Sequence, residues 1–349
     1  MRHRKRPSPD QTRLLIGAGL ALLAARKLRE HRYDLEGKNV LITGGSRGLG
    51  LALAREFGAA GARLIICGRD AESLERAADS LTKAGVTVVA ITCDVTDQAA
   101  VRLMLDQVRQ RCGPIDVLVN NAGVIEVGPA ETMSIADYEE AMATNFWGML
   151  YPTLGVLPEM RARGAGRVVN ITSIGGKLGI PHLLPYSASK FAAVGFSEGL
   201  RTEVGSDGIK VVTVCPGLMR TGSPRHAIFR GQHRSEYAWF SISDALPGLS
   251  ISAERAARRI VAACRRGDAE VLFPITARAA AVANALAPGV TARVLSVVDR
   301  LLPGPEGGAG GRRKGSESQS SLSPSWLTTL GDRAAREYNQ IAPSTGATS

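Results

Sequence analysis

The stretch Lys38-Asn-Val-Leu-Ile-Thr-Gly-Gly-Ser-Arg-Gly-Leu-Gly50 decides the fold. It opens as an apolar run, turns through a glycine-rich segment, and continues over residues 48–60 with the apolar spacing of a helix. Gly44, Gly48 and Gly50 permit a tight turn and a close approach of the backbone to a pyrophosphate at the helix N-terminus. Glycine loops also serve as plain turns, so the motif gains its weight from the strand before it and the helix after it.

The same alternation of strand and helix continues along the chain. Apolar strands are predicted at residues 63–67, 86–93, 115–120, 167–172, 209–215 and 269–273, with helices at 72–84, 97–110, 134–157, 186–204 and 253–266. Near-continuous Val/Ile/Leu strands separated by helices indicate a parallel sheet that is covered on both faces. The prediction is an α/β fold, a Rossmann-type doubly wound parallel sheet, forming a single catalytic domain over residues 37–275 with N- and C-terminal extensions.

A tyrosine and a lysine stand four residues apart in Tyr186-Ser-Ala-Ser-Lys190, at the start of a predicted helix. Positions i and i+4 share one helix face, so the ammonium of Lys190 is expected beside the phenol of Tyr186. A neighbouring positive charge lowers the pKa of a phenol toward the range useful for general acid–base catalysis. Ser173 follows the predicted strand 167–172, where its hydroxyl could polarise a substrate carbonyl. Such a pair also occurs by chance on exposed helices, and the upstream glycine loop is what favours the catalytic interpretation.

Taken together, the motifs resemble the classical short-chain dehydrogenase/reductase family. They are Thr43-Gly-x-x-x-Gly-x-Gly50, Asn120-Asn-Ala-Gly123, Asn145, Ser173, Tyr186-x-x-x-Lys190 and Pro216-Gly217, in family order and at family spacing over residues 37–275.

The resemblance implies the catalytic roles. Tyr186 exchanges a proton with the substrate oxygen, and Lys190 lowers the pKa of Tyr186 and binds the nicotinamide ribose. Ser173 holds the substrate oxygen, and Asn145 helps a water relay protons to Lys190. A substrate alcohol or carbonyl and a nicotinamide cofactor are therefore expected.

The resemblance also implies the cofactor-binding residues. Asn121, Ala122 and Gly123 line the adenosine and ribose, Asp94 and Val95 the adenine, and Thr221 contacts the nicotinamide carboxamide. The full predicted set is Gly44, Ser46, Arg47, Gly48, Leu49, Gly50, Arg69, Asp94, Val95, Asn121, Ala122, Gly123, Tyr186, Lys190 and Thr221.

The residues after the second strand favour NADP(H) over NAD(H). Members that prefer NAD carry an acidic residue there, which binds the ribose 2′-hydroxyl. This chain has Gly68 followed by Arg69, and Arg47 lies within the glycine loop. Guanidinium groups offer forked donors that suit a 2′-phosphate, although both side chains would also be ordinary surface arginines.

The N-terminal arm, residues 1–36, is basic and apolar. Residues 1–33 hold nine Lys/Arg against two acidic residues, so +7 of the net charge of +11 lies there, around an uncharged run at residues 14–25. Twelve residues are too few to span a bilayer. The alternatives are a helix on an anionic membrane surface, a helix packed on the domain, and a signal or spanning segment. We expect a cytoplasmic protein, peripheral at the inner face of a membrane if the first alternative holds.

The remaining composition excludes several classes. Nucleic acid is not an expected partner, because the chain beyond the arm is only mildly basic and has no nucleic-acid motif. The five cysteines form no Cys-x-x-Cys pair, which predicts reduced thiols. His3, His31, His226 and His233 make no ligand cluster, so no metal site is predicted. His182, between Ser173 and Tyr186, could touch the substrate, but it is interpreted as a surface turn residue.

The C-terminal third carries three predictions. Residues 216–249 lack clear periodicity and read as a substrate lid. Residues 276–302 form a helical extension, broken at Pro288-Gly289, and residues 303–349 read as a flexible linker and tail with one short helix at 325–338.

The substrate pocket is predicted to be apolar, with Ile174, Leu178, Ile180, Leu183, Leu184, Met219, Phe229, Trp239 and Phe240 on its side of the domain. This favours a small lipophilic carbonyl or alcohol of the steroid, retinoid or long-chain type. The alternatives are a catalytically silent NADP-sensing regulatory or scaffold protein on the same fold, and a β-ketoacyl-type reductase. The family resemblance also implies a homo-oligomer, formed through the helices on either side of the fifth strand.

Overall fold

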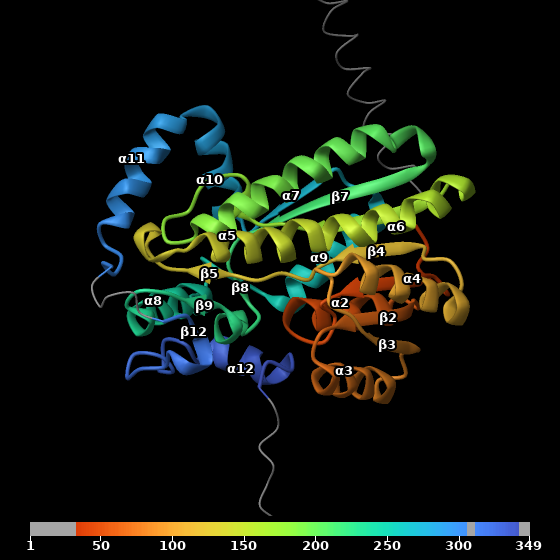
Figure 1. The fold of residues 1–349 in the computed structure, drawn as a ribbon, viewed down its shortest axis with the longest axis horizontal. Helices are drawn as coiled ribbons and strands as arrows, with labels where there is room; N and C mark the ends of the chain where they lie inside the picture. Colours follow the sequence, from red (N-terminus) through yellow and green to blue (C-terminus); the bar gives the residue numbers. More distant parts are fainter. Residues whose placement is uncertain (1–32, 306–310, 342–349) are drawn as a thin grey trace, which may run out of the picture. The chain divides into compact units, whose positions relative to one another are not determined.

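The computed structural model describes residues 33–305 and 311–341. Residues 1–34 and 35–349 form two separate units, and the fold below is that of the second unit (Figure 1). Residues 1–32, which carry most of the predicted arm, lie outside the described residues, as do residues 342–349 of the predicted tail.

A seven-stranded parallel sheet forms the centre of this unit, in the order β3-β2-β1-β4-β6-β7-β11. Its strands are β1 Asn39–Thr43, β2 Arg63–Gly68, β3 Val88–Thr92, β4 Val117–Asn120, β6 Gly166–Ile171, β7 Ile209–Pro216 and β11 Glu270–Phe273. The strand order reverses beside β1, so the carboxyl ends of β1 and β4 border the crevice where such folds bind ligands. The predicted doubly wound α/β fold is confirmed.

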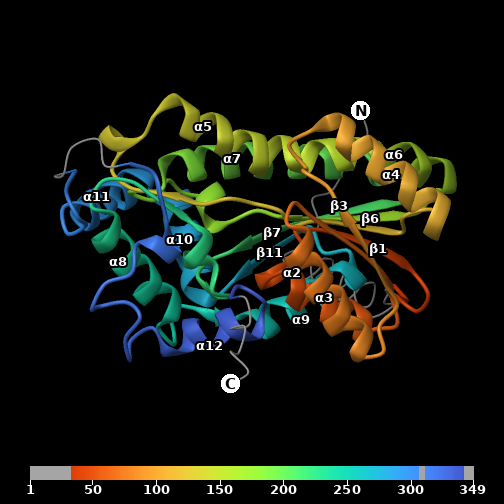
Figure 2. The ribbon, with the colours of Figure 1, turned by 60° about the horizontal axis from the view of Figure 1, so that its bottom comes forward.

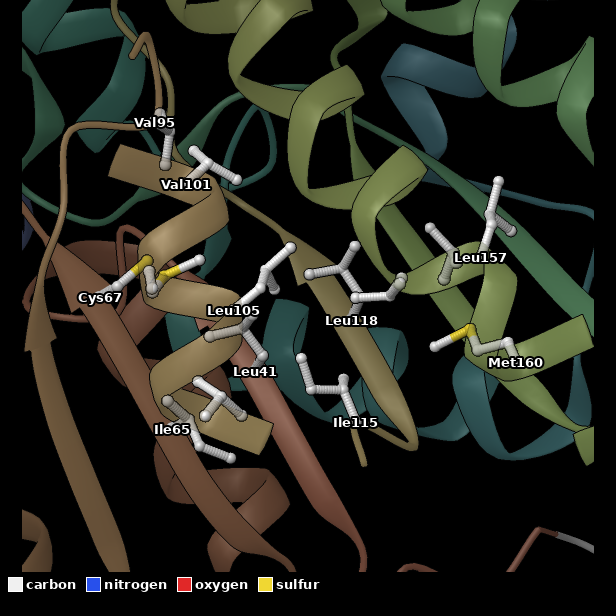
Figure 3. Packing of buried hydrophobic residues seen from close by; sticks show 14 of the residues in the cluster. Leu41, Ile65, Cys67, Val95, Val101, Leu105, Ile115, Leu118, Leu157 and Met160 are labelled. Carbon is white, nitrogen blue, oxygen red and sulfur yellow. The ribbon is translucent and has the colours of Figure 1, made fainter. Parts of the chain in front are cut away.

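Helices cover both faces of the sheet (Figures 1 and 2). One face carries α4 Gln98–Cys112, α6 Gly148–Arg163 and α7 Leu184–Glu203, and the other carries α2 Gly48–Ala59, α3 Ala71–Lys83 and α9 Ala253–Arg266. Figure 3 shows the core between the sheet and the first set, where Leu105 of α4 and Met160 of α6 pack with Leu41 of β1 and Leu118 of β4. These four side chains are at most 2% exposed, so the sheet edge that holds the site rests on a dry core.

The helix predicted over 134–157 is interrupted. It begins as α5 Ile135–Met142, passes through a π-helical turn at Ala143–Trp147, and continues as α6 to Arg163. Such turns are rare and concentrate at functional sites. This one carries Asn145.

The segment predicted to be an aperiodic lid contains a regular helix, α8 His233–Ala245, and two short strands, β8 Met219–Arg220 and β9 Ile228–Phe229. The sequence hides the helix because its buried face is partly polar: Glu236, Ser241 and Asp244 are buried together with Tyr237 and Phe240. Hydrophobic periodicity therefore fails as a signal there.

The predictions for the two parts of the C-terminal extension differ in how well they match the structure. Helices α10 Ile275–Leu286 and α11 Pro288–Asp299 are separated at Pro288 as predicted, because proline is favoured at the first position of a helix. The prediction of a flexible linker is wrong for residues 311–324, where β12 Arg313–Lys314 pairs with β9. The short helix predicted at 325–338 is present as α12 Thr329–Glu337, which packs near α8.

Serine hydroxyls explain why the tail folds. The hydroxyls of Ser318 and Ser323 are buried, where that of Ser318 bonds to the Lys314 carbonyl (2.9 Å) and that of Ser323 to Ser241 (2.8 Å). A serine-rich composition is typical of linkers, but here its polar groups are satisfied inside the fold. In the described part of the chain, no helix is both long and apolar enough to cross a membrane.

Candidate active site

The glycine loop between β1 and α2 is built by close backbone packing. Gly44 has φ +64°, and a Cβ there would lie 3.0 Å from the Cα of Ala122. A Cβ on Gly50 would overlap the Gly44 carbonyl oxygen and lie 2.6 Å from the Asn121 side chain. These two glycines are therefore required for the loop to lie against the segment that follows β4.

That neighbouring segment is tied to the loop by hydrogen bonds. The Thr43 hydroxyl accepts from the amides of Asn121 (3.0 Å) and Ala122 (3.1 Å), and the Asn121 side chain donates to the carbonyls of Thr43 and Gly44. The predicted cofactor residues from these two loops are thus brought together.

The start of α2 offers unused donors. Arg47 is its N-cap residue and provides no side-chain cap. Among the described residues, the amides of Leu49 and Gly50 have no hydrogen-bond acceptor. Backbone N–H groups at a helix start, with the positive end of the helix dipole, suit the pyrophosphate of a dinucleotide, so the residues present fit the predicted cofactor.

The predicted 2′-phosphate residues lie near one another beside this loop. Arg69 approaches Asp94 at 4.0 Å, with both side chains well exposed, so this ion pair leaves the guanidinium available. Asp70, the next residue, caps α3 by accepting from the Ser73 amide (2.8 Å), and this bond lowers the pKa of its carboxyl. The acidic side chain nearest the end of β2 is therefore already engaged. Burial lowers the pKa of Arg47, which remains a cation.

The remaining predicted cofactor residues have structural contacts of their own. The Asp94 carboxylate accepts from the amide (3.0 Å) and the hydroxyl (2.9 Å) of Thr96, so it also caps the end of its strand. Val95 is buried beneath Gly148, and Ser46 is buried in the glycine loop. Thr221 is 3% exposed, and its hydroxyl accepts from the Ser223 amide.

The four predicted catalytic residues come from three elements. Ser173 follows β6, Tyr186 and Lys190 lie one turn apart on α7, and Asn145 lies in the π-helical turn. The Lys190 ammonium lies 5.6 Å from the centre of the Tyr186 ring and donates to the Ile171 carbonyl at 3.2 Å. The Ser173 hydroxyl accepts from the Gly175 amide at 3.0 Å.

The side chain of Asn145 is held within the site by three hydrogen bonds. Its side chain accepts from the Val124 amide and donates to the Val124 carbonyl and the Ser189 hydroxyl, each at 3.0 Å. A Cβ on Gly123 would lie 2.9 Å from the Asn145 oxygen and 3.6 Å from the Lys190 nitrogen. Asn145 and Lys190 therefore flank Gly123, at the end of the loop after β4.

The pKa of Tyr186 is raised to about 12, not lowered as predicted. Burial disfavours the phenolate, and the hydrogen bond from Ser173 opposes it only in part. Burial also lowers the pKa of Lys190 to about 8. In the protein alone, desolvation is the largest cause of both shifts, because both groups are enclosed.

Two fully buried glutamates were not anticipated from the sequence. Glu126, in the two-residue strand β5 Glu126–Val127, is fully buried, and neither carboxyl oxygen has a hydrogen-bond partner in the described residues. Glu236 of α8 is also fully buried and pairs with His182 (2.8 Å) and the indole of Trp239 (2.6 Å). His182 is therefore not a surface turn residue as predicted: it is buried, with φ +60°.

Glu126 predicts a pH-dependent stability. Burial first, and then the charge of Glu140, raise its pKa from 4.5 to about 8, so between these values the folded chain holds a proton that the unfolded chain has released. Stability must then fall as pH rises through this window. We expect the stability of Glu126→Gln relative to the wild type to rise by about 4 kcal/mol between about pH 5 and about pH 8.5, measured by chemical denaturation. A difference between the two proteins that does not change with pH would contradict this.

The apolar side chains beside Tyr186 form one cluster: Val127, Leu183, Ala227, Phe229, Tyr237 and Phe240, with Ile125, Ile180, Tyr186 and Trp239 packed against it. Five of the predicted pocket residues are among them. Leu184, by contrast, is 46% exposed. Within residues 33–305 and 311–341 no group of His, Cys, Asp and Glu could hold a metal ion.

Comparisons with known proteins show what this chain is similar to. The short chain dehydrogenase family model matches residues 38–227. The chain is 36% identical over 280 residues to a dehydrogenase/reductase SDR family protein 7-like of Anopheles gambiae, covering 78% of this chain and 87% of the relative. It is 34% identical over 214 residues to 17-beta-hydroxysteroid dehydrogenase 13 of Rattus norvegicus, covering 60% and 71%.

A solved structure of a variant actinorhodin polyketide ketoreductase with NADPH superposes with a TM-score of 0.60 at 33% identity, covering 68% of this chain and 95% of that one. The family model spans more than half of the chain, and the mosquito relative is matched over most of its own length. This protein therefore belongs to the short-chain dehydrogenase/reductase family.

Proposed function

We propose that this protein is an NADP(H)-dependent oxidoreductase that transfers a hydride between its cofactor and a carbonyl or alcohol carbon of a small lipophilic substrate. The observation that carries the proposal is the convergence of Ser173, Tyr186, Lys190 and Asn145 beside the crevice at the carboxyl ends of β1 and β4. When bound, the nicotinamide supplies or accepts the hydride.

The side chains of this chain provide the proton transfer. The phenol of Tyr186 donates a proton to the substrate oxygen in reduction and accepts one in oxidation, while the Ser173 hydroxyl holds that oxygen. Burial raises the pKa of Tyr186, so the phenol is protonated at neutral pH in the protein alone. Lys190 lies next to Tyr186, and its positive charge stabilises the negative charge that develops on the Tyr186 oxygen when the proton leaves. Asn145 fixes the loop beside Lys190.

The choice of NADP(H) rests on Arg47 and Arg69. Both lie beside the glycine loop, and the nearby carboxylate of Asp70 is held by the Ser73 amide, so it is poorly placed to bind a ribose hydroxyl. The NADPH in the related ketoreductase structure supports the same choice.

Nucleotide titration tests this part of the proposal. We expect wild-type protein to bind NADPH more tightly than NADH, followed by nicotinamide fluorescence. Arg69→Ala should weaken NADPH binding about tenfold and leave NADH binding nearly unchanged, because a charged hydrogen bond to the 2′-phosphate is lost. Arg102→Ala, an exposed arginine on α4, is the matched control and should change neither constant. Equal loss of both nucleotides in Arg69→Ala would refute the assigned role.

The apolar cluster beside Tyr186 supports a lipophilic substrate, and the hydroxysteroid dehydrogenase relative is consistent with one. A β-ketoacyl-type reductase is the second candidate, favoured by the likeness to the polyketide ketoreductase. Comparing free lipophilic ketones with β-ketoacyl thioesters as substrates for NADPH oxidation separates the two.

Two further expectations stay predictions. Self-association is supported by large apolar side chains at the surface, Trp147 and Leu154 near and on α6 and Phe191 on α7, which are 42%, 52% and 46% exposed. Attachment of the basic arm to the inner face of a membrane involves residues 1–32, which lie outside the described residues.

A further inference from the structure

The chain that leaves α12 runs across the glycine loop. Residues 338–340, here named the C-terminal clamp, follow directly on α12, whose Ala335 lies so close to Gly222 that a Cβ there would be 2.5 Å from its Cα. Tyr338 is 5% exposed and Gln340 9% exposed. A segment near the end of the chain is therefore buried against the residues predicted to bind the cofactor.

Asn339 holds the clamp in place. It adopts φ +56°, a left-handed conformation that asparagine tolerates better than most residues. Its side-chain nitrogen donates to the carbonyls of Ser46 and Ser73, each at 2.9 Å, and its side-chain oxygen accepts from Arg76 at 3.2 Å. These three bonds join the clamp to the glycine loop and to the first turns of α3.

Gln340 fills the approach to the second glycine of the loop. In a dinucleotide-binding loop this glycine lacks a side chain so that the pyrophosphate can come close to the backbone. In this protein a Cβ on Gly48 would lie 2.7 Å from the side-chain nitrogen of Gln340, which donates to the Thr221 carbonyl at 3.1 Å. The Gln340 side-chain oxygen is buried with no partner in the described residues.

The clamp also takes one of the donors at the start of α2. The Gly48 amide donates to the Tyr338 carbonyl at 2.8 Å, whereas the amides of Leu49 and Gly50 have no acceptor within residues 33–305 and 311–341. A carbonyl oxygen at this position does what a phosphate oxygen would do. The space beside Gly48 is thus occupied both by a hydrogen-bond acceptor and by the amide of Gln340.

We propose that residues 338–340 are an autoinhibitory clamp that competes with the cofactor pyrophosphate for Gly48 and must withdraw before the cofactor binds fully. The inference rests on the proposed NADP(H) binding. Withdrawal breaks the Asn339 bonds and frees the buried, unpartnered oxygen of Gln340. Whatever draws the last residues away from the glycine loop would then raise cofactor affinity.

The test compares NADPH affinity in the full chain, in a chain ending at Glu337, and in Asn339→Gly. Ending at Glu337 keeps all of α12, and glycine at position 339 keeps the left-handed conformation while removing the three side-chain bonds. We expect the shortened chain to bind NADPH about tenfold more tightly and Asn339→Gly to shift part of the way, by fluorescence titration. Trp326→Ala, an 84% exposed position in the same tail, should bind as the wild type does.

Hydrogen exchange gives a second readout with a definite sign. Saturating NADPH should speed exchange in peptides from residues 337–349 if the clamp withdraws. Slower exchange in these peptides, or NADPH affinity that is unchanged or weaker in both altered proteins, would overturn the proposed competition. The segment would then stabilise the bound cofactor or have no effect on its binding. If neither the full nor the shortened chain binds NADPH or NADH while both remain folded by circular dichroism, the proposed cofactor fails and the competition fails with it.

Discussion

Tyr186→Phe is expected to lower kcat/KM by about a thousandfold or more while NADPH binding stays close to that of the wild type. The substitution removes only the phenolic hydroxyl, the group that exchanges a proton with the substrate oxygen. General acid–base groups typically contribute 10²–10⁴-fold. The ring remains, so its packing against the apolar cluster is kept. Steady-state reduction of a lipophilic ketone, followed by nicotinamide absorbance, measures the loss.

The matched control is Tyr151→Phe on α6, where the ring stacks on Trp147 at 5.8 Å and the hydroxyl has no part in the proposed mechanism. It should retain nearly full activity. More than about a tenth of wild-type activity in Tyr186→Phe would remove this residue from the proton transfer. If the wild type bound NADPH but reduced no carbonyl substrate, the catalytically silent alternative would lead instead.

The parts of the fold that the sequence predicted are those encoded locally. A buried parallel strand must be an apolar run, a glycine loop must follow β1, and Tyr186 and Lys190 share a helix face because they are one turn apart. Helix α8 was not predicted, because its buried face is partly polar. Glu236 is buried there because His182 and Trp239, on either side of it in sequence, satisfy its hydrogen bonds.

The parts that were missed depend on partners distant in sequence. Nothing near Asn339 indicates that Ser46, almost three hundred residues earlier, will accept its hydrogen bond. Composition likewise suggested a linker where Ser318 and Ser323 are buried. The pKa of Tyr186 was mispredicted for a related reason: spacing gives the proximity of Lys190, but only the packed structure gives the desolvation that opposes it.

Gly50→Ala is expected to destabilise the protein by about 3 kcal/mol or more and to weaken NADPH binding with it. Its Cβ would overlap the Gly44 carbonyl oxygen and lie 2.6 Å from the Asn121 side chain. The first neighbour is backbone, so relief requires the glycine loop to move away from α2. That movement would displace the amides of Leu49 and Gly50 that are proposed to face the pyrophosphate. Thermal denaturation and NADPH titration measure the two effects.

Gly289→Ala in the first turn of α11 is the matched control, because a Cβ there meets nothing within 4 Å. Alanine is the better helix former, so this change should leave stability unchanged or raise it by up to about 1 kcal/mol. The contrast separates crowding at the loop from the general effect of replacing a helical glycine. If Gly50→Ala were as stable as Gly289→Ala yet bound NADPH poorly, the glycine would serve nucleotide approach alone. If both stability and NADPH affinity were retained, the close packing of Gly50 on Gly44 would not be what shapes the loop.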